Sequence, residues 1–200
     1  MPSLLPRLVV ASSNPGKLRE LERLLAGVAL EIIPQAALGI ETAAETVATF
    51  EGNALLKARH AARLAGSAAL ADDSGLEVDA LGGRPGVHSA RYAGEGASDA
   101  DNNALLLREL AEYPEPRLAR YRCAIALVRD ASDPAPIVVA RSWEGRIALK
   151  PRGEGGFGYD PLFLVGDGTT SAAELPLELK NRISHRALAL HVLLERLRSP

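Results

Sequence analysis

The sequence predicts an α/β fold in which helices flank a mixed, largely extended β-sheet. Two patterns lead to this prediction: strand-like and helix-like segments alternate in the first half of the chain, and strand-like runs cluster in the second half. The chain has 200 residues, of which 47% are hydrophobic. That size and composition allow one or two lobes around a real core.

The first segments are predicted as strand, helix and strand. The β-branched run Leu8–Ala11 indicates a strand that ends in a polar loop. A helix is expected next, because leucines recur at helical spacing at positions 18, 21, 24 and 25. Glu31–Pro34 is the second expected strand, and residues 36–49 form a polar connection that contains Glu45.

An amphipathic helix is predicted over Phe50–Ala65. Thr49 is suited to cap its beginning, and Gly66 is suited to end it. The short apolar run Ala68–Ala71 then reads as a buried strand. It delivers the paired carboxylates Asp72-Asp73, after which we expect a turn.

The second half is predicted to be richer in strands. Its glycines and Pro85 favour a long irregular connection over Leu81–Gly96, and loops of that length often carry function. The remaining expected elements, in order, are a helix over Asp101–Ala111, strands over Arg122–Arg129, Ile137–Trp143 and Gly145–Leu149, a glycine and aromatic loop over Gly153–Pro161, a strand over Leu162–Val165, and a helix from Ser184 through Leu197.

Composition excludes several classes of function. A formal net charge of −2 provides no broad basic field, so we expect no nucleic-acid partner. No segment approaches the roughly 20 apolar residues of a membrane helix. The single cysteine, Cys123, excludes an internal disulfide and a multi-cysteine zinc site, and it fits a cytoplasmic location.

The pair Asp72-Asp73 is the most informative feature of the chain. Two adjacent anions are unfavourable unless a cation, a proton or strong hydrogen bonds compensate them, so the pair suggests a metal or proton-transfer site. The alternative is a solvated turn, because Asp, Ser and Gly also form ordinary turns. Adjacent residues of an extended segment point to opposite sides, so we expect the two carboxylates to have different partners.

Two further groups of polar residues could bind phosphate. The loop Ser12–Lys17 leaves a strand and enters a helix, so unpaired backbone N–H groups and the charge of Lys17 would suit a phosphate. A simple helix cap is the alternative. Asn53 and Lys57 are four residues apart and share one helix face. That face points either into the same site as Lys17 or to solvent.

A later group of residues could recognise a planar ring. Glycines in the segment Gly155–Pro161 allow close approach to a ligand, and its aromatic side chains could stack on a nucleobase. A turn that merely buries Phe157 is the alternative. Lys180 and Ser184–Arg186 bring hydrogen-bond donors to the start of the last helix, where we favour recognition over general-base chemistry for His185.

Taken together, six ordered motifs make the chain resemble the inosine/xanthosine triphosphate pyrophosphatase family of Ham1-like and RdgB-like enzymes. The motifs span nearly the whole chain, and their order is highly specific. They are Ser12-x-Asn14-x-x-Lys17, Phe50-x-x-Asn53-Ala54-x-x-Lys57-Ala58, Ala71-Asp72-Asp73-Ser74-Gly75-Leu76, Pro85-Gly86-x-x-Ser89-Ala90-Arg91-Tyr92, Gly156-Phe157-Gly158-Tyr159-Asp160-Pro161 and Ser184-His185-Arg186.

This resemblance implies Mg²⁺-dependent hydrolysis of purine nucleoside triphosphates between the α and β phosphates, with the deaminated substrates ITP, dITP and XTP preferred. It also implies a homodimer and a single domain over residues 1–200, elongated and made of two lobes with a central cleft. Asp73 would accept a proton from the attacking water and contact the metal together with Asp72 and Glu45. The expected substrate-binding residues are Ser12, Ser13, Asn14, Pro15, Gly16, Lys17, Lys57, Ser74, Phe157, Gly158, Tyr159, Asp160, Lys180, His185 and Arg186.

The chain departs from the family pattern near the second helix. Ala44 precedes Glu45 where relatives often carry two neighbouring acids, and Gly52 stands where many relatives carry a glutamate. Two other functions are compatible with parts of the pattern. One is a Maf-like pyrophosphatase for other modified nucleotides, and the other is a sensor that binds a nucleotide without cleaving it.

Overall fold

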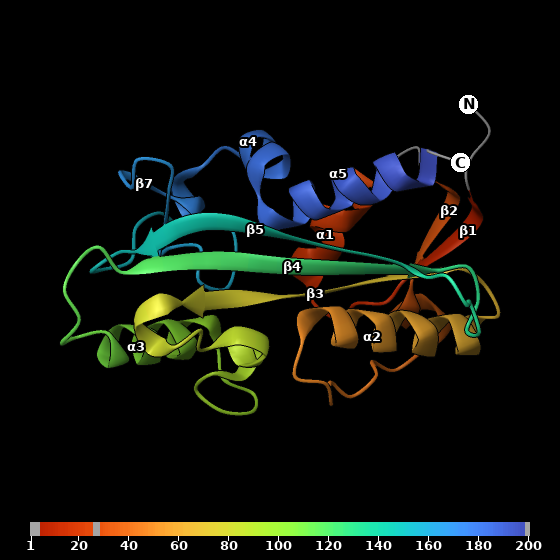
Figure 1. Cartoon of the computed structure of the whole chain (residues 1–200), viewed down its shortest axis with the longest axis horizontal. Coiled ribbons are helices and arrows are strands. Elements are labelled where there is room, and N and C mark those ends of the chain that lie inside the picture. The colour runs from red at the N-terminus through yellow and green to blue at the C-terminus, as the bar shows by residue number, and fades with distance from the viewer. Residues whose placement is uncertain (1–4, 26–28, 199–200) are drawn as a thin grey trace. The chain divides into compact units, whose positions relative to one another are not determined.

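The computed structural model describes residues 5–25 and 29–198, and it confirms an α/β fold with a mixed sheet (Figure 1). The strands are β1 (Leu5–Val10), β2 (Ala29–Pro34), β3 (Ala69–Val78), β4 (Leu118–Val128), β5 (Ile137–Ile147), β6 (Phe163–Val165) and β7 (Thr170–Ser171). The helices are α1 (Pro15–Leu24), α2 (Phe50–Ala65), α3 (Asp99–Glu109), α4 (Leu177–Ile183) and α5 (His185–Arg198).

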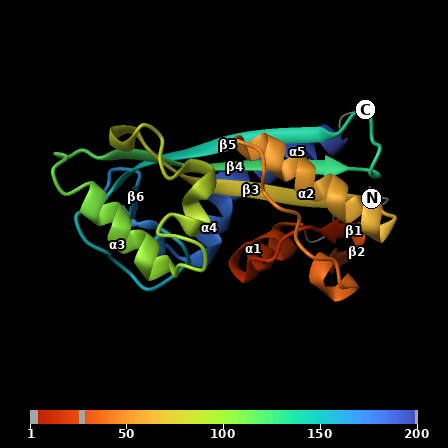
Figure 2. The same cartoon turned by 90° about the horizontal axis from the view of Figure 1, so that it is seen from below.

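The sheet has the strand order β2-β1-β3-β4-β5-β6-β7. Strand β1 is parallel to both β2 and β3, whereas β6 is antiparallel to both β5 and β7. Figure 2 shows the long strands β3, β4 and β5 side by side. The parallel part contains the strand–helix alternation of the first half, and the antiparallel part contains the strands that cluster in the second half.

The chain forms two compact units. The first unit contains the residues up to Asp73, Cys123–Arg141 and the residues from Arg186 onward. The second unit contains Ser74–Arg122 and Ser142–His185. Because β3, β4 and β5 each contribute residues to both units, the chain passes from one unit to the other within these strands.

The core of the first unit forms between its strands and the helices α1 and α5. Leu8, Leu70 and Ile125 from the strands pack there with Leu21 from α1 and Leu193 from α5. Helix α2 lies on the other side of these strands from α5 (Figure 1). Cys123 belongs to the same core, and burial raises the pKa of its thiol to about 12, which suits a packing role.

Helix α2 has the predicted bounds because both of its ends carry local signals. The hydroxyl of Thr49 accepts a hydrogen bond from the backbone N–H of Gly52 at 3.2 Å. Gly66 ends the helix with a left-handed φ of 61°, a conformation that strains residues with a β-carbon. Ala54, Ala58 and Ala61 form the buried face of the helix.

We expect the substitution Gly66→Ala to destabilise the protein by about 1–2 kcal/mol, because alanine is strained at positive φ. Apart from the adjoining backbone, no atom of the described residues lies within 4 Å of the added β-carbon, so the effect isolates backbone strain from steric clash. Urea unfolding of the variant and the wild type measures the difference. A variant at least as stable as the wild type would contradict this account of the helix end.

The predicted turn after Asp73 is wrong, because β3 continues to Val78. Leu76 and Val78 are fully buried in the core of the second unit, and the N–H of Leu76 donates to the hydroxyl of Ser89 at 2.9 Å. Burial and pairing therefore outweigh the turn preference of Ser74 and Gly75.

The second half differs from the sequence-based expectation in two more places. The segments predicted as separate strands around residue 144 form the single strand β5. Its Gly145 fits because a β-carbon there would lie 2.4 Å from the carbonyl oxygen of Leu164 in β6. Helix α4 was not predicted. Its Leu177 and Leu179 are exposed, so the helix lacks the apolar stripe by which a helix is recognised in a sequence.

The second unit has its own aromatic core. Tyr121, Trp143, Tyr159 and Phe163 lie in it together with residues of α3 such as Leu106. In the part of the chain that the structure describes, no helix combines the length and the apolar character needed to cross a membrane.

Candidate active site

Asp72 and Asp73 lie side by side on β3 and are almost completely buried, with exposed fractions of 1% and 4%. The solvated-turn interpretation is therefore wrong. Asp72 contacts Lys17 and Arg186, whereas Asp73 contacts Lys57 and Asn53. The expectation that adjacent strand residues have different partners is confirmed.

Two cations hold the carboxylate of Asp72. Arg186 donates to Asp72 Oδ2 from Nε at 3.1 Å and from Nη2 at 3.0 Å, and Lys17 Nζ lies 3.4 Å from the same oxygen. Burial alone would raise the pKa of Asp72, but the charges of Lys17 and Arg186 outweigh it and hold the pKa well below its ordinary value. Asp72 therefore stays ionised.

The buried guanidinium of Arg186 has a second acidic partner, Glu20 of α1, to which its Nη1 donates. Sequence reasoning missed Glu20. Its signal was present, because Glu20 follows Lys17 by three residues and precedes Leu24 by four, which places it on one helix face with them.

Asp73 accepts hydrogen bonds on both carboxylate oxygens. Lys57 Nζ lies 3.1 Å from Oδ1, and Asn53 Nδ2 lies 3.2 Å from Oδ2. Lys57 also donates to Glu45 Oε1 at 2.8 Å. Since Asn53 and Lys57 are both buried, the solvent-facing interpretation of this helix face is wrong.

The charges around Asp73 shift its pKa upward. Burial raises the pKa of Asp73, the nearby Glu45 adds to the rise, and the charges of Lys57 and Lys17 oppose it without cancelling it. Burial lowers the pKa of Lys57. The negative charges of Asp73, Asp72 and Glu45 have the larger effect, so the pKa of Lys57 is raised. A carboxylate with a raised pKa accepts a proton more readily than an ordinary aspartate does.

The loop Ser12–Lys17 begins helix α1 with an asparagine cap. Asn14 Oδ1 accepts from the backbone N–H of Gly16 at 2.8 Å and from that of Lys17 at 3.1 Å. The expectation of unpaired N–H groups is therefore wrong for these two residues, because the cap uses them. The same cap directs Lys17 toward Asp72, while Ser13 and Pro15 are exposed.

In the second unit, Asp160 organises the glycine and aromatic loop. Its Oδ2 accepts from the N–H of Phe157 at 2.9 Å and from Lys180 Nζ at 2.6 Å. The Lys180 ammonium also lies 4.9 Å from the centre of the Phe157 ring. Gly156 has a φ of 76°, and a β-carbon there would lie 2.0 Å from Asp160 Oδ2, so glycine is required at this position.

His185 belongs to an aromatic stack in the same unit. Its ring lies 4.7 Å from the ring of Tyr121 at an angle of 11°, and 6.3 Å from the ring of Trp143. Tyr121 was not predicted as part of the site. The stack holds the imidazole in one orientation and leaves it 5% exposed.

The acidic residues of the first unit supply oxygen donors only, which suits a hard divalent cation. Within residues 5–25 and 29–198, no three His, Cys, Asp or Glu side chains are arranged to hold a metal ion by themselves. Lys17 and Lys57 lie among the carboxylates instead. This arrangement fits Mg²⁺, which usually takes one or two carboxylates and completes its shell with water and phosphate oxygens.

Comparison with known proteins decides the family. The sequence model of the Ham1 family matches residues 8–196. The chain belongs to the Ham1 family. A dITP/XTP pyrophosphatase of Methylococcus capsulatus is 58% identical to it over 96% of both chains, and one of Ralstonia nicotianae is 56% identical over the same shares. The structure of a HAM1 protein from Coxiella burnetii superposes with a TM-score of 0.88 at 45% identity, covering 97% of this chain and 99% of that one.

In this Ham1-family chain the predicted site residues fall into two groups. The first unit contains Ser12, Ser13, Asn14, Pro15, Gly16, Lys17, Glu45, Lys57, Asp72, Asp73 and Arg186. The second unit contains Ser74, Phe157, Gly158, Tyr159, Asp160, Lys180 and His185. Arg186 was predicted with the base-reading residues, but its side chain contacts Asp72 and Glu20.

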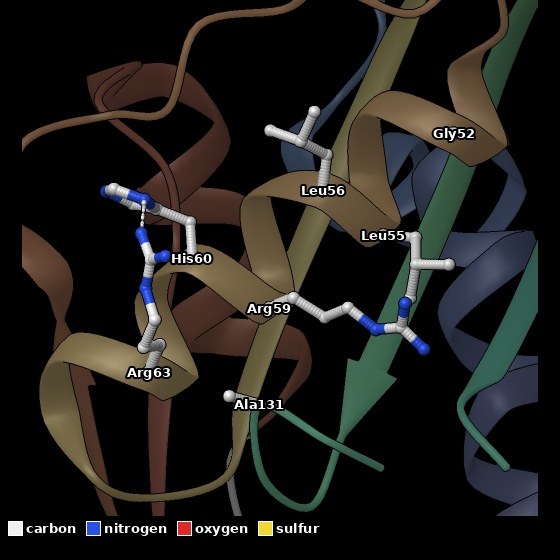
Figure 3. A pocket seen from close by; sticks show the side chains of 7 residues that line it. All are labelled: Gly52, Leu55, Leu56, Arg59, His60, Arg63 and Ala131. Atoms are coloured by element: carbon white, nitrogen blue, oxygen red, sulfur yellow. Dashed lines mark hydrogen bonds between the residues drawn. The ribbon is translucent and has the colours of Figure 1, made fainter. Parts of the chain in front are cut away.

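The chain also has a surface hollow of about 540 Å³ on helix α2 (Figure 3). It is lined by Gly52, Leu55, Leu56, Arg59, His60, Arg63 and Ala131. Arg63 Nη2 lies 3.3 Å from His60 Nδ1, and His60 Nε2 lies 3.1 Å from the carbonyl oxygen of Glu41. None of the predicted site residues lines this hollow.

Proposed function

We propose that this chain hydrolyses deaminated purine nucleoside triphosphates to the nucleoside monophosphate and pyrophosphate, and that Mg²⁺ is required. One observation carries the proposal: the buried pair Asp72-Asp73 lies among Lys17, Lys57 and Glu45 in a chain 58% identical to a dITP/XTP pyrophosphatase. The residues supply both signs of charge that a metal–triphosphate substrate needs.

The first unit would bind the triphosphate and its metal. Lys17 and Lys57 provide two ammonium groups for phosphate oxygens, although the whole chain carries a net charge of −2. Asp73 and Glu45, which share the ammonium group of Lys57, would hold Mg²⁺, whereas Asp72 would stay paired with Lys17 and Arg186. When bound, the ion neutralises charge on the phosphate oxygens of the substrate.

Asp73 would act as the general base. It accepts a proton from a water molecule on a carboxylate oxygen, since each oxygen keeps a second lone pair beside its present donor. The water oxygen forms a bond to the α phosphorus, and the bond from that phosphorus to the bridging oxygen breaks. Pyrophosphate leaves with the bridging oxygen, and Lys17 and Lys57 stabilise the charge that develops on the phosphates.

The second unit would recognise the base. The Phe157 ring offers a stacking surface, while Lys180 and His185 offer hydrogen-bond donors. Hypoxanthine and xanthine carry an oxo group at position 6, which accepts hydrogen bonds, whereas adenine carries an amino group that donates them. Fixed donors therefore favour the deaminated bases, because adenine would leave buried donors facing each other.

The decisive assay offers the purified protein ITP, XTP, GTP, ATP and a pyrimidine panel with Mg²⁺, and measures pyrophosphate and orthophosphate separately. We expect pyrophosphate as the direct product, with ITP and XTP cleaved fastest. Preference for modified pyrimidine or methylated nucleotides would support a Maf-like enzyme instead. Binding without product would support a sensor, and direct release of orthophosphate would contradict the proposed bond cleavage.

Removal of the metal is expected to reduce pyrophosphate release to background. The carboxylates around Asp73 would otherwise face the phosphates without a compensating divalent charge. The measurement is turnover of ITP in excess EDTA, followed by addition of excess Mg²⁺, which should restore the rate. EDTA saturated with Mg²⁺ beforehand is the control. Undiminished turnover in EDTA would contradict the metal requirement.

A further inference from the structure

The side chain of Asn53 joins the polar connection before α2 to Asp73. Asn53 Oδ1 accepts from the backbone N–H of Val47 at 3.0 Å, and Asn53 Nδ2 donates to Asp73 Oδ2 at 3.2 Å. The side chain is 1% exposed. Both ends of the amide are therefore occupied inside the first unit.

The contact with Val47 determines which way the amide points. A backbone N–H can only donate, so the oxygen of Asn53 must face Val47 and its NH₂ group must face Asp73. Lys57 lies one helical turn further along α2 and donates to the other oxygen of Asp73 at 3.1 Å. Donors on both oxygens fix the plane of the carboxylate, which a single donor would leave free to turn.

The position of the Val47 side chain depends in turn on the glycine at position 52. A β-carbon there would lie 2.4 Å from Val47 Cγ1 and 2.9 Å from Thr49 Oγ1, so Val47 packs where a side chain would otherwise stand. Figure 3 shows Gly52 in the first turn of α2. Glycine in a helix costs about 1 kcal/mol relative to alanine, and here it permits the contact between Val47 and Asn53.

We propose that Asn53 is a positioning residue that orients the carboxylate of Asp73 toward the attacking water, with Gly52 and Val47 holding its amide in place. The inference rests on the hydrolysis proposed above. Asn53 is neutral, so it directs Asp73 without adding a charge beside Lys57. A misplacement of about 1 Å at a reacting group is enough to lower a rate about 100-fold.

The first test is the isosteric variant Asn53→Asp, which keeps the acceptor for Val47 but replaces the donor to Asp73 with a second carboxyl group. We expect kcat for ITP to fall at least about 10-fold, with KM within about threefold of the wild type. Asn102→Asp is the matched control. Asn102 is also a buried helix residue whose Oδ1 accepts from a backbone N–H, that of Ala93 at 2.8 Å, but it does not contact Asp73. Its kcat should stay within about twofold.

The variant Gly52→Ala tests the same orientation without touching Asp73 or Asn53. The added methyl group displaces Val47, so we expect kcat to fall a few-fold while KM is retained. If Asn53→Asp melts below the assay temperature, this variant decides the question by itself. A kcat within twofold of the wild type in whichever folded variant is assayed would overturn the positioning role.

Hydrogen exchange of the Val47 amide tests the geometry without any substrate. Protection should persist in Asn53→Asp and fall at least about 10-fold in Asn53→Leu, which has no acceptor. Equal protection in Asn53→Leu and the wild type would overturn the inference. If the wild type releases no pyrophosphate from any nucleotide, the proposed function fails, whereas the exchange result still decides whether Asn53 is held as described.

Discussion

Replacing Asp73 with asparagine is expected to lower kcat for ITP about 100- to 10,000-fold, the usual contribution of a general base. The substitution keeps the shape of the side chain but removes its ability to take a proton from water. Lys17 and the second-unit residues remain to bind the substrate, so affinity should change far less than turnover. Pyrophosphate release measures kcat, and calorimetry with a substrate analogue that carries a methylene bridge between the α and β phosphorus measures binding.

A matched control for this variant is Asp133→Asn. Asp133 is also buried, at 1% exposure, and it is held by Arg129 in the turn between β4 and β5. Its replacement removes a carboxylate that is about as buried as that of Asp73 but has no part in the proposed chemistry. Stability should fall, and kcat should not. Activity of Asp73→Asn within tenfold of the wild type would show that another group accepts the proton.

The parts of the fold that could be predicted are those with local signals. Thr49 and Gly66 mark the ends of α2 by capping chemistry, so the predicted bounds of this helix are confirmed. The end of β3 was not predictable in this way. Ser74 and Gly75 favour a turn locally, but the core of the second unit buries Leu76 and Val78 and keeps the strand extended.

Much the same division applies to the candidate site. Asp72, Asp73, Lys17 and Lys57 could be selected from the sequence. Adjacent acids, residues four apart on a helix, and a lysine in a loop between a strand and a helix have geometric consequences that need no tertiary information. The contact of Arg186 with Asp72 joins residues 114 positions apart, and no local pattern reveals it. The homodimer and the cytoplasmic location stay predictions.

The other large effect is expected from Arg186→Met, which should destabilise the protein by about 3–5 kcal/mol near pH 7. The guanidinium is 1% exposed and contacts the buried carboxylates of Asp72 and Glu20. Removing Arg186 leaves two buried carboxylates with much less compensating charge, although Lys17 still contacts Asp72, and this costs far more than the loss of a surface pair. Since domains are stable by about 5–15 kcal/mol, the variant should be close to its unfolding limit. Arg196→Met, an exposed position on the same helix, is the control and should cost less than about 1 kcal/mol.

The pH dependence of this loss distinguishes uncompensated charge from lost packing. In the wild type the pKa of Asp72 is depressed, so the pair contributes stability above the ordinary aspartate pKa and loses it as the pH falls through the lower, folded value. Without Arg186 the folded pKa of Asp72 rises, and the buried carboxyl group takes up a proton at a higher pH than in the wild type. The stability difference between Arg186→Met and the wild type should therefore be largest near pH 7 and shrink toward pH 4. Urea unfolding of both proteins across this range measures it, and a difference that does not change with pH would assign the role of Arg186 to packing instead of charge.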